Sequence, residues 1–234
     1  MNVELPPNET LREILARGYV TDADGGRLPL YAGISPLHAA TLYRVVMEHR
    51  PKLVVETGMC LGISTLSILT ALRERGEGGR LISIDPFQST HDRSIGLLNV
   101  RRAGLDALHE FIEKTSYSAL PELLAAGRRI QFGYIDGNHR FDHALLDFFY
   151  LDKMMDVGGV IAFNDCGWRA IHHALNFVRM HRKYKELDVA LRKSYEGRNV
   201  LFSLIRRLER RSSSDRYFQK IEDWEPEGHF FRRP

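Results

Sequence analysis

The sequence predicts an α/β fold: a doubly wound, mostly parallel sheet with helices on both of its faces. Short apolar runs alternate along the chain with segments of ten or more residues that have helical spacing, and such crossovers return each strand parallel to the one before. Four of the apolar runs end in an acid, at Glu56, Asp85, Asp136 and Asp165. Because ligands of such sheets bind beyond the carboxyl ends of the strands, these acids mark the expected site.

The elements follow from their patterns in chain order. Apolar runs predict strands at 53–56, 81–85, 130–136 and 159–165. Apolar residues at helical spacing predict helices at 8–17, 36–49, 63–75, 92–103, 106–113, 118–126, 140–155 and 168–182. Residues 18–35 are rich in turn formers and predict a loop that could fold over a ligand. Two late segments, 186–193 and 199–207, predict an antiparallel strand pair at one edge of the sheet. The whole is a Rossmann-like arrangement.

Composition narrows the class of protein. Hydrophobic residues at 44% and charged residues at 27% are ordinary for a soluble folded chain of 234 residues. No apolar run approaches the roughly 20 residues that span a bilayer, and the N-terminus lacks the layout of a signal peptide, so we expect a cytoplasmic protein. The only cysteines, Cys60 and Cys166, exclude a disulfide framework and a CxxC zinc pattern.

The C-terminal region carries much of the net charge of +3, in the clusters RRLERR (206–211) and FFRRP (230–234). Aromatic residues are not interleaved with these arginines as a base-stacking surface requires, so we do not expect a nucleic-acid partner. The tail DRYFQKIEDWEPEGHFFRRP (215–234) is rich in aromatic residues. We expect it to dock on the domain or on a neighbouring subunit, which makes a homodimer plausible.

The strongest signal is the run LVVETGMCLGIS at residues 53–64. Glycine removes the Cβ where the backbone must approach a ligand, and Ser64 falls where a helix exposes unpaired N–H groups. Asp85 ends the next strand, where a carboxylate can accept hydrogen bonds from ribose hydroxyls or simply cap the following turn. The spacing ExGxxxG lacks the third glycine of the dinucleotide fingerprint, which disfavours a nicotinamide dehydrogenase.

Three motifs in order carry a family resemblance. ETGMCLGIS (56–64) resembles motif I of class I S-adenosylmethionine-dependent methyltransferases, in its catechol-type O-methyltransferase form, and LISIDPF (81–87) resembles their ribose-binding strand. Residues 134–168 resemble the block IDGxHxYxxxxxDxxxxxxxLxxGGxIxxxD of bacterial small-molecule methyltransferases, which include macrolide-sugar and cephalosporin-pathway enzymes. The resemblance implies S-adenosylmethionine as cofactor and a small-molecule hydroxyl as methyl acceptor.

The resemblance also implies roles for individual residues. Gly58 and Ser64 would contact the methionyl end of the cofactor, Asp85 the ribose, and Glu56 would organise the loop through hydrogen bonds. Residues 115–117 would close over the adenine, or form a helix N-cap instead. The expected cofactor-binding residues are Glu56, Gly58, Met59, Gly62, Ser64, Asp85, Ser116 and Asp136.

Asp136 and Asp165 match the aspartate pair that binds Mg²⁺ in the metal-dependent members. A hard divalent cation takes oxygen ligands, so Asn164 or Asn138 could complete the site. The chain departs from the catechol pattern at Cys166, where that subfamily has an asparagine ligand, and a thiol is a poor ligand for Mg²⁺. In the alternative without metal, Asp136 contacts the cofactor amine and Asp165 is structural.

His139 occupies the position at which the catechol enzymes carry a lysine base. An imidazole can take a proton from a hydroxyl near neutral pH, so His139 is the expected base, acting with Asp136; alternatively it caps the helix that starts at residue 140. Candidates for the wall of a substrate pocket are Tyr31, His38, Phe87 and Trp168.

The expected organisation is therefore an N-terminal region with helices and a lid or substrate loop (1–50), a cofactor-binding methyltransferase domain (51–205) and a docked tail (206–234). The expected function is methyl transfer from S-adenosylmethionine to a hydroxyl of a small molecule, with possible help from Mg²⁺ or another divalent cation. Two alternatives stay open: an amine or nucleic-acid base as acceptor, and a protein that binds the cofactor without turnover.

Overall fold

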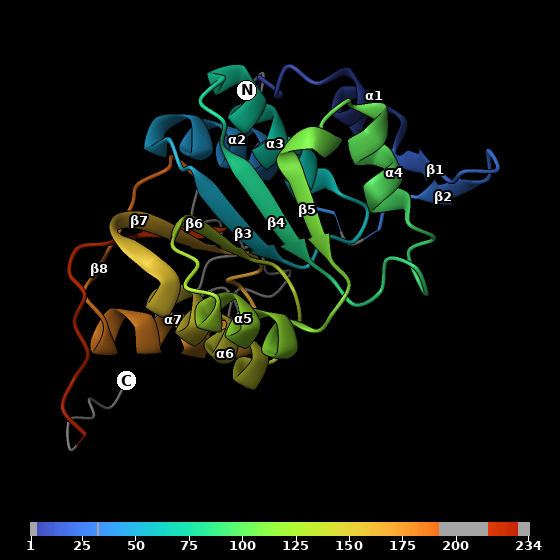
Figure 1. Ribbon diagram of the computed structural model, residues 1–234. Coiled ribbons are helices and arrows are strands. Elements are labelled where there is room, and N and C mark those ends of the chain that lie inside the picture. The colour runs from blue at the N-terminus through green and yellow to red at the C-terminus, as the bar shows by residue number, and fades with distance from the viewer. Residues whose placement is uncertain (1–3, 32, 192–214, 229–234) are drawn as a thin grey trace, which may run out of the picture.

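A computed structural model describes residues 4–31, 33–191 and 215–228. Its main sheet has seven strands in the order β5-β4-β3-β6-β7-β9-β8. Neighbours from β5 to β7 are parallel, whereas β9 runs antiparallel to both β7 and β8. Helices α1 to α4 cover one face of the sheet and α5 to α7 cover the other (Figure 1). The predicted fold class, with an antiparallel pair at one edge, is confirmed.

The helices and strands have these bounds. The sheet contains β3 (Leu53–Thr57), β4 (Arg80–Ile84), β5 (His109–Ile112), β6 (Ile130–Ile135), β7 (Met155–Phe163), β8 (Tyr184–Glu186) and β9 (Arg216–Lys220). The helices are α1 (Glu9–Arg17), α2 (Pro36–His49), α3 (Ile63–Arg75), α4 (Ile95–Arg102), α5 (Ser116–Ala125), α6 (Phe141–Met154) and α7 (Arg169–His181).

Local sequence signals explain why several elements begin where predicted. Asn8 caps α1 by accepting a hydrogen bond from the backbone N–H of Leu11 at 3.0 Å. In β3, Val54 packs into the core beneath α1 to α4 and Val55 into the core beneath α5 to α7. Because successive strand residues face opposite sides, a strand covered on both faces is apolar at every central position.

Sequence predictions for two segments before the C-terminal region are wrong. Residues 106–113, predicted to be helical, form a 3₁₀ turn (Asp106–Leu108) and the edge strand β5. The segment is short, and pairing with β4 decides its conformation over local propensity. Residues 18–35 are not only a loop, because they contain the hairpin of β1 (Tyr19–Thr21) and β2 (Arg27–Pro29). The Asp22 carboxylate accepts hydrogen bonds from the N–H groups of Asp24 and Gly26 in its turn.

The antiparallel strands at the edge come from other residues than predicted. The first predicted strand, 186–193, overlaps β8 only at Glu186, and the second, 199–207, lies outside the described residues. The strand that pairs with β8 is β9, from the segment expected to dock as a tail. It also pairs with β7, with Val160 opposite Gln219 and Phe163 opposite Arg216. Residues 216–220 are thus an internal strand of the sheet.

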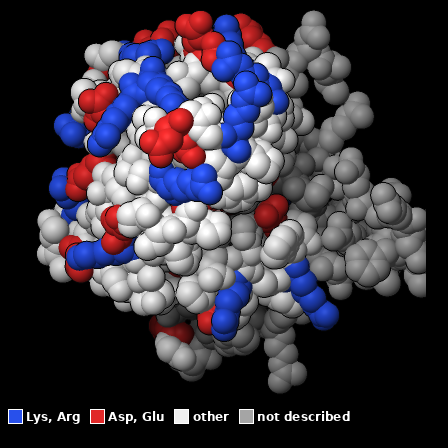
Figure 2. Space-filling view, turned by 90° about the vertical axis from the view of Figure 1, so that its right-hand side faces the viewer, with Lys and Arg blue, Asp and Glu red and all other residues white. Residues whose placement is uncertain are grey.

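The surface carries mixed charge. Figure 2 shows that, on the side turned toward the viewer, Lys and Arg side chains are interspersed with Asp and Glu side chains over the described residues. None of the helices in the described part of the chain combines the length and the apolar character that a membrane crossing requires.

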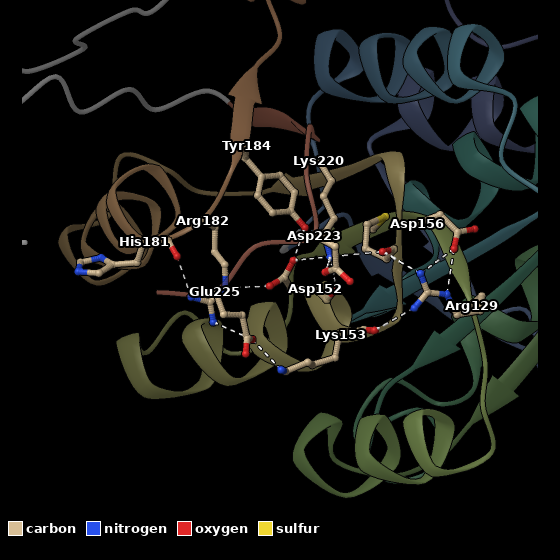
Figure 3. A network of polar contacts seen from close by, with 11 residues as sticks. Arg129, Asp152, Lys153, Asp156, His181, Arg182, Tyr184, Lys220, Asp223 and Glu225 are labelled. Atoms are coloured by element: carbon tan, nitrogen blue, oxygen red, sulfur yellow. Dashed lines mark hydrogen bonds and ion pairs between the residues drawn. The ribbon is translucent and has the colours of Figure 1, made fainter. Parts of the chain in front are cut away.

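A cluster of buried charges fastens β9 to the helices and is shown in Figure 3. Lys220, only 2% exposed, donates through Nζ to the carbonyl oxygen of Asp152 at 2.8 Å and lies 3.1 Å from its carboxylate. The same carboxylate accepts hydrogen bonds from Arg182 Nε at 2.9 Å and from the Tyr184 hydroxyl at 2.7 Å. Asp152 therefore joins α6, β8 and β9 at one buried point.

Candidate active site

A cavity of about 750 Å³ opens at the carboxyl ends of β3, β4 and β6. Its position is the topological switch point of the sheet, because the chain proceeds from β3 through β4 to β5 and then returns to the other side of β3 as β6. Of the expected cofactor-binding residues, the following six line it: Gly58, Met59, Ser64, Asp85, Ser116 and Asp136. Glu56 and Gly62 are not among the lining residues and lie behind it.

The glycine loop crosses another part of the backbone at close range. Gly58 has φ 88°, and a Cβ there would lie 2.2 Å from the carbonyl oxygen of Asp136. The second glycine, Gly62, has φ 84° and would bring a Cβ within 3.2 Å of the Gly96 backbone. The glycines thus allow the loop to pack on the β6–α6 connection and on α4, while Gly58 also faces the cavity.

Asp85 holds the loop in place. Its Oδ2 accepts hydrogen bonds from the backbone N–H groups of Met59 at 2.8 Å and Cys60 at 2.9 Å. Its Oδ1 accepts one from the N–H of Phe87 at 2.8 Å, which is the alternative role of capping the following turn. Carboxylate oxygens have further lone pairs, and Asp85 lines the cavity, so the same group can also face a ribose.

Glu56 is fully buried beneath the loop. Its Oε1 accepts the hydroxyl hydrogens of Thr65 and Ser83, each at 2.5 Å, while Oε2 has no hydrogen-bond partner. Burial raises the pKa of Glu56 to about 7. These contacts connect β3, β4 and α3.

His139 lies between the two expected metal ligands. Its Nε2 is 3.1 Å from Oδ2 of Asp165 and 3.6 Å from Oδ1 of Asp136. Hydrogen bonding to Asp136 and Asp165 raises the pKa of His139 to about 9, and burial raises the pKa of Asp136 to about 7. Trp168 stands beside the imidazole, with the ring centroids 5.0 Å apart. The β6–α6 and β7–α7 loops thus bring these side chains together.

Asn164 is directed elsewhere. Its amide nitrogen donates to Asp215 at 3.1 Å and to the Tyr134 hydroxyl at 3.3 Å. The thiol of Cys166 is buried and donates to the carbonyl oxygen of Phe163 at 3.1 Å. The other candidate, Asn138, lines the cavity and accepts a hydrogen bond from the N–H of Arg140. Within the described residues no group of three or more His, Cys, Asp or Glu side chains is arranged to hold a metal ion.

Three of the four candidates for the substrate wall line the cavity. Phe87 and Trp168 are more than half exposed at its rim, and Tyr31 closes it from the N-terminal segment. His38 is not a lining residue; its Nδ1 lies 3.4 Å from Oδ1 of Asp215 instead. Residues 115–117 line the cavity, and Thr115 is also the N-cap residue of α5.

Two acids in this region were not predicted from the sequence. Asp92 lines the cavity from the β4–α4 loop, where no motif marks it. Asp215 precedes β9, and only the unexpected insertion of β9 into the sheet brings it beneath Asn164. Burial raises the pKa of the Asp215 carboxyl group to about 7.

The sequence is similar to known methyltransferases. Residues 55–166 match the model of a family described as a methyltransferase domain. The chain is 24% identical over 145 residues to caffeoyl-CoA O-methyltransferase of Stellaria longipes, covering 59% of this chain and 56% of that protein. It is 28% identical over 123 residues to flavonoid 3',5'-methyltransferase of Vitis vinifera, a match that covers 50% of this chain and 48% of that protein. The chain thus spans about half the length of the curated relatives it matches.

Solved structures share the fold. An O-methyltransferase from Bacillus cereus in complex with SAH superposes with a TM-score of 0.65 at 19% identity, over 79% of this chain and 85% of that one. The O-methyltransferase TomG from Streptomyces achromogenes, in complex with SAM, superposes with a TM-score of 0.68 at 14% identity. The match covers 93% of this chain and 92% of that one. Residues 55–166 therefore match a methyltransferase domain, and the chain shares the fold of these O-methyltransferase structures.

Proposed function

We propose that this protein transfers the methyl group of S-adenosylmethionine to a hydroxyl of a small molecule. The observation that carries the proposal is the continuity of one cavity, which contains the glycine loop and Asp85 at one side and His139 with Trp168 at the other. A cofactor bound along the loop would direct its methyl group toward the histidine. Proximity and alignment of the reacting groups then supply much of the rate enhancement.

The names of the relatives support a hydroxyl acceptor. Two curated relatives are named as methyltransferases of caffeoyl-CoA and of flavonoids, and both structural neighbours are named as O-methyltransferases. The exposed rings of Phe87 and Trp168 at the rim of the cavity suit an acceptor with apolar surface. On the face shown in Figure 2, charges of both signs are mixed, so this face lacks the uniformly basic surface that binds nucleic acids.

The cavity provides for each part of the cofactor. Helix α3 begins after Gly62 without a side-chain cap, so its first N–H groups can bind the carboxylate of the methionyl end. Asp85, Ser116 and Tyr117 all line the cavity, where Asp85 would face the ribose and the other two would contact the adenine.

The proposed reaction is an in-line displacement, in which the acceptor oxygen, the methyl carbon and the sulfur lie on one line. A lone pair of the acceptor oxygen forms a bond to the methyl carbon while the bond from that carbon to sulfur breaks. The electron pair stays on sulfur, which yields S-adenosylhomocysteine. The hydroxyl proton passes to Nε2 of His139 in its neutral form, a step typically worth about 10²- to 10⁴-fold in rate. Because the pKa of His139 is raised to about 9, the share of this neutral form, and with it the rate, should increase as the pH rises toward 9. Asp136 and Asp165 hold this nitrogen toward the cavity.

The two aspartates also fit a divalent cation. Their carboxylates face a single nitrogen atom from opposite loops, so two hard oxygen donors converge on one region. Mg²⁺ is commonly held by one or two carboxylates together with water and substrate oxygens, so Asn164 is not required. Such an ion would lower the pKa of the acceptor hydroxyl.

Isothermal titration with S-adenosylmethionine, followed by measurement of S-adenosylhomocysteine over a panel of catechols, flavonoids, hydroxycinnamoyl thioesters and matched amines, tests the proposal. We expect cofactor binding, and turnover with hydroxyl acceptors only. His139→Gln should retain cofactor affinity and lose most of the rate, whereas His173→Gln, an exposed histidine on α7, should retain both. Cofactor binding without product from any acceptor, or preference for amines, would contradict it.

A further inference from the structure

A buried carboxylate lies outside the cavity, behind the loop that carries Asp165. Asp215 immediately precedes β9, and its side chain is completely buried. It lies beneath the β7–α7 loop, in contact with Asn164. The motifs recognised in the sequence end at residue 168 and so do not include it. The chemistry proposed above assigns it no role.

Asp215 takes part in a closed set of three hydrogen bonds. Its Oδ1 accepts from the amide nitrogen of Asn164 at 3.1 Å, and its Oδ2 accepts from the Tyr134 hydroxyl at 2.9 Å. The same amide nitrogen also donates to the Tyr134 hydroxyl at 3.3 Å. Burial raises the pKa of Tyr134, so its hydroxyl keeps the proton and remains a donor. Because both partners donate, the position requires two acceptor oxygens, which an ionised aspartate provides and an asparagine does not.

Asn164 connects this carboxylate to Asp165, the next residue in the chain. The backbone N–H of Asn164 donates to the carbonyl oxygen of Ile135 at 3.0 Å, while its side chain is held by Asp215. Asp165 itself has φ 50°, a left-handed conformation that is unfavourable for a residue with a Cβ. On its other side, the N–H of Trp168 donates to the Asp165 carbonyl oxygen at 2.9 Å. Contacts before and after Asp165 therefore maintain this conformation.

The conformation is the one that brings Asp165 to the expected base. Its Oδ2 lies 3.1 Å from Nε2 of His139, and the Trp168 ring stands beside the imidazole with the centroids 5.0 Å apart. A change of φ at residue 165 would redirect the carboxylate and would also move Trp168, which follows on the same loop. A series of contacts thus leads from Asp215 to His139.

Asp215 also contacts the N-terminal region. The Nδ1 atom of His38, in the first turn of α2, lies 3.4 Å from Oδ1 of Asp215. Helix α2 begins after the N-cap residue Ser35, and Ile34, which precedes that residue, lines the cavity. Asp215 therefore joins α2, β6 and the β7–α7 loop at one buried point.

We propose that Asp215 is a positioning residue for methyl transfer: through Asn164 it fixes Asp165 and so directs Nε2 of His139 toward the acceptor hydroxyl. The inference rests on the proposed function and deepens it, because it makes the residue before the C-terminal strand a support of the base. Asp215 is not among the residues that line the cavity. Its loss should therefore slow the chemical step and leave cofactor binding unchanged.

Two tyrosines provide matched variants. Tyr134→Phe removes the hydroxyl that donates to Asp215, and Tyr184→Phe removes one that donates to the buried Asp152 (Figure 3). Both variants should lose similar stability in denaturant titrations, since each loses one buried hydrogen bond. Asp215→Asn should lower kcat by roughly 10- to 100-fold, which is part of what a base supplies, and Tyr134→Phe should lower it by a smaller factor. In both, the KM of the acceptor and the calorimetric Kd of S-adenosylmethionine should stay at the wild-type values. Tyr184→Phe should change none of these three quantities.

Fluorescence can follow the β7–α7 loop without turnover. The chain has two tryptophans, so Trp224→Phe leaves Trp168, beside His139, as the single emitter. In this background, Asp215→Asn and Tyr134→Phe should change the emission of Trp168 because its surroundings change. Tyr184→Phe should leave the emission as it is.

Several results would overturn the inference. One is an equal loss of kcat in Tyr134→Phe and Tyr184→Phe, which indicates destabilisation alone. Others are an unchanged kcat in both Asp215→Asn and Tyr134→Phe, and a weaker affinity of Asp215→Asn for S-adenosylmethionine. If wild type shows no turnover with any acceptor, the proposed function fails, and the Trp168 emission then decides whether Asp215 holds the loop. If Asp215→Asn does not fold, the results with Tyr134→Phe decide.

Discussion

Ser83 donates its hydroxyl hydrogen to Glu56 at 2.5 Å, from one central strand of the sheet to the next. His109 lies 2.7 Å from the same hydroxyl, and Thr65 donates to the same carboxylate oxygen from α3. A chain of hydrogen-bonded polar side chains therefore connects β5, β4, β3 and α3 beneath the cofactor loop. One member of it, Glu56, has a pKa raised from 4.5 to about 7 by burial.

The Glu56 carboxylate makes stability depend on pH. Because its pKa is higher in the folded state than in the unfolded state, its contribution is fully present below about pH 4.5 and is lost as the pH rises through 7. The free energy of unfolding of Glu56→Gln relative to wild type should therefore rise between pH 4.5 and 7 and level off above. Chemical denaturation across this range measures it, with Glu122→Gln, an exposed acid, as control. A difference that does not change with pH would contradict the buried-acid account.

Gly58 should not tolerate a side chain. Gly58→Ala introduces strain at φ 88° and a clash with the Asp136 carbonyl oxygen. Gly104→Ala is the matched control, because Gly104 has φ 64° but no atom within 4 Å of the position that a Cβ would occupy. The control should cost about 1–2 kcal/mol of unfolding free energy from the backbone alone. Gly58→Ala should cost about 1–3 kcal/mol more from overpacking, and should also lower cofactor affinity. Equal costs in denaturant titrations would show that the close approach does not matter.

The aspartate pair should separate cofactor binding from metal assistance. Asp165 is not among the residues that line the cavity, whereas Asp136 is. Asp165→Asn should thus abolish turnover with Mg²⁺ while cofactor affinity stays the same, and Asp136→Asn should lower both. Treatment of wild type with EDTA should stop turnover, and added Mg²⁺ should restore it. Calorimetry with Mg²⁺ should show binding to wild type and none to either variant. Full activity of Asp165→Asn, together with a wild type indifferent to EDTA, would rule the cation out.

The charge cluster around Asp152 should stabilise the fold through β9. Lys220→Met leaves the buried Asp152 carboxylate with less compensation and should cost about 3–5 kcal/mol of unfolding free energy. Asp223→Asn removes another partner of Lys220, but Asp223 is 74% exposed, so about 0–1 kcal/mol is expected. Equilibrium unfolding in urea compares the two variants. Similar small losses in both would show that the cluster is not what holds the strand.

Many of the helix and strand bounds could be predicted because they depend on residues that are close together in the sequence. The cap at Asn8 and the bounds of α2 and α3 are local, and hydrogen bonds within a few residues decide them. Strand polarity is also predictable from crossovers, which is why Glu56, Asp85 and Asp136 were expected at one edge of the sheet. These signals were enough to predict the fold class and the cofactor loop.

Features that depend on partners far apart in the sequence, such as strand pairing and the neighbours of buried acids, were decided only by the tertiary structure. The segment HEFI became β5 through pairing with β4, and residues 216–220 joined the sheet beside β7, far from them in sequence. That insertion places Asp215 against Asn164 and so directs the amide away from Asp165. Asp92 likewise lines the cavity, where it accepts hydrogen bonds from Tyr31 and Gln88. Residue type shows which groups can bind, but long-range packing decides which of them share a site.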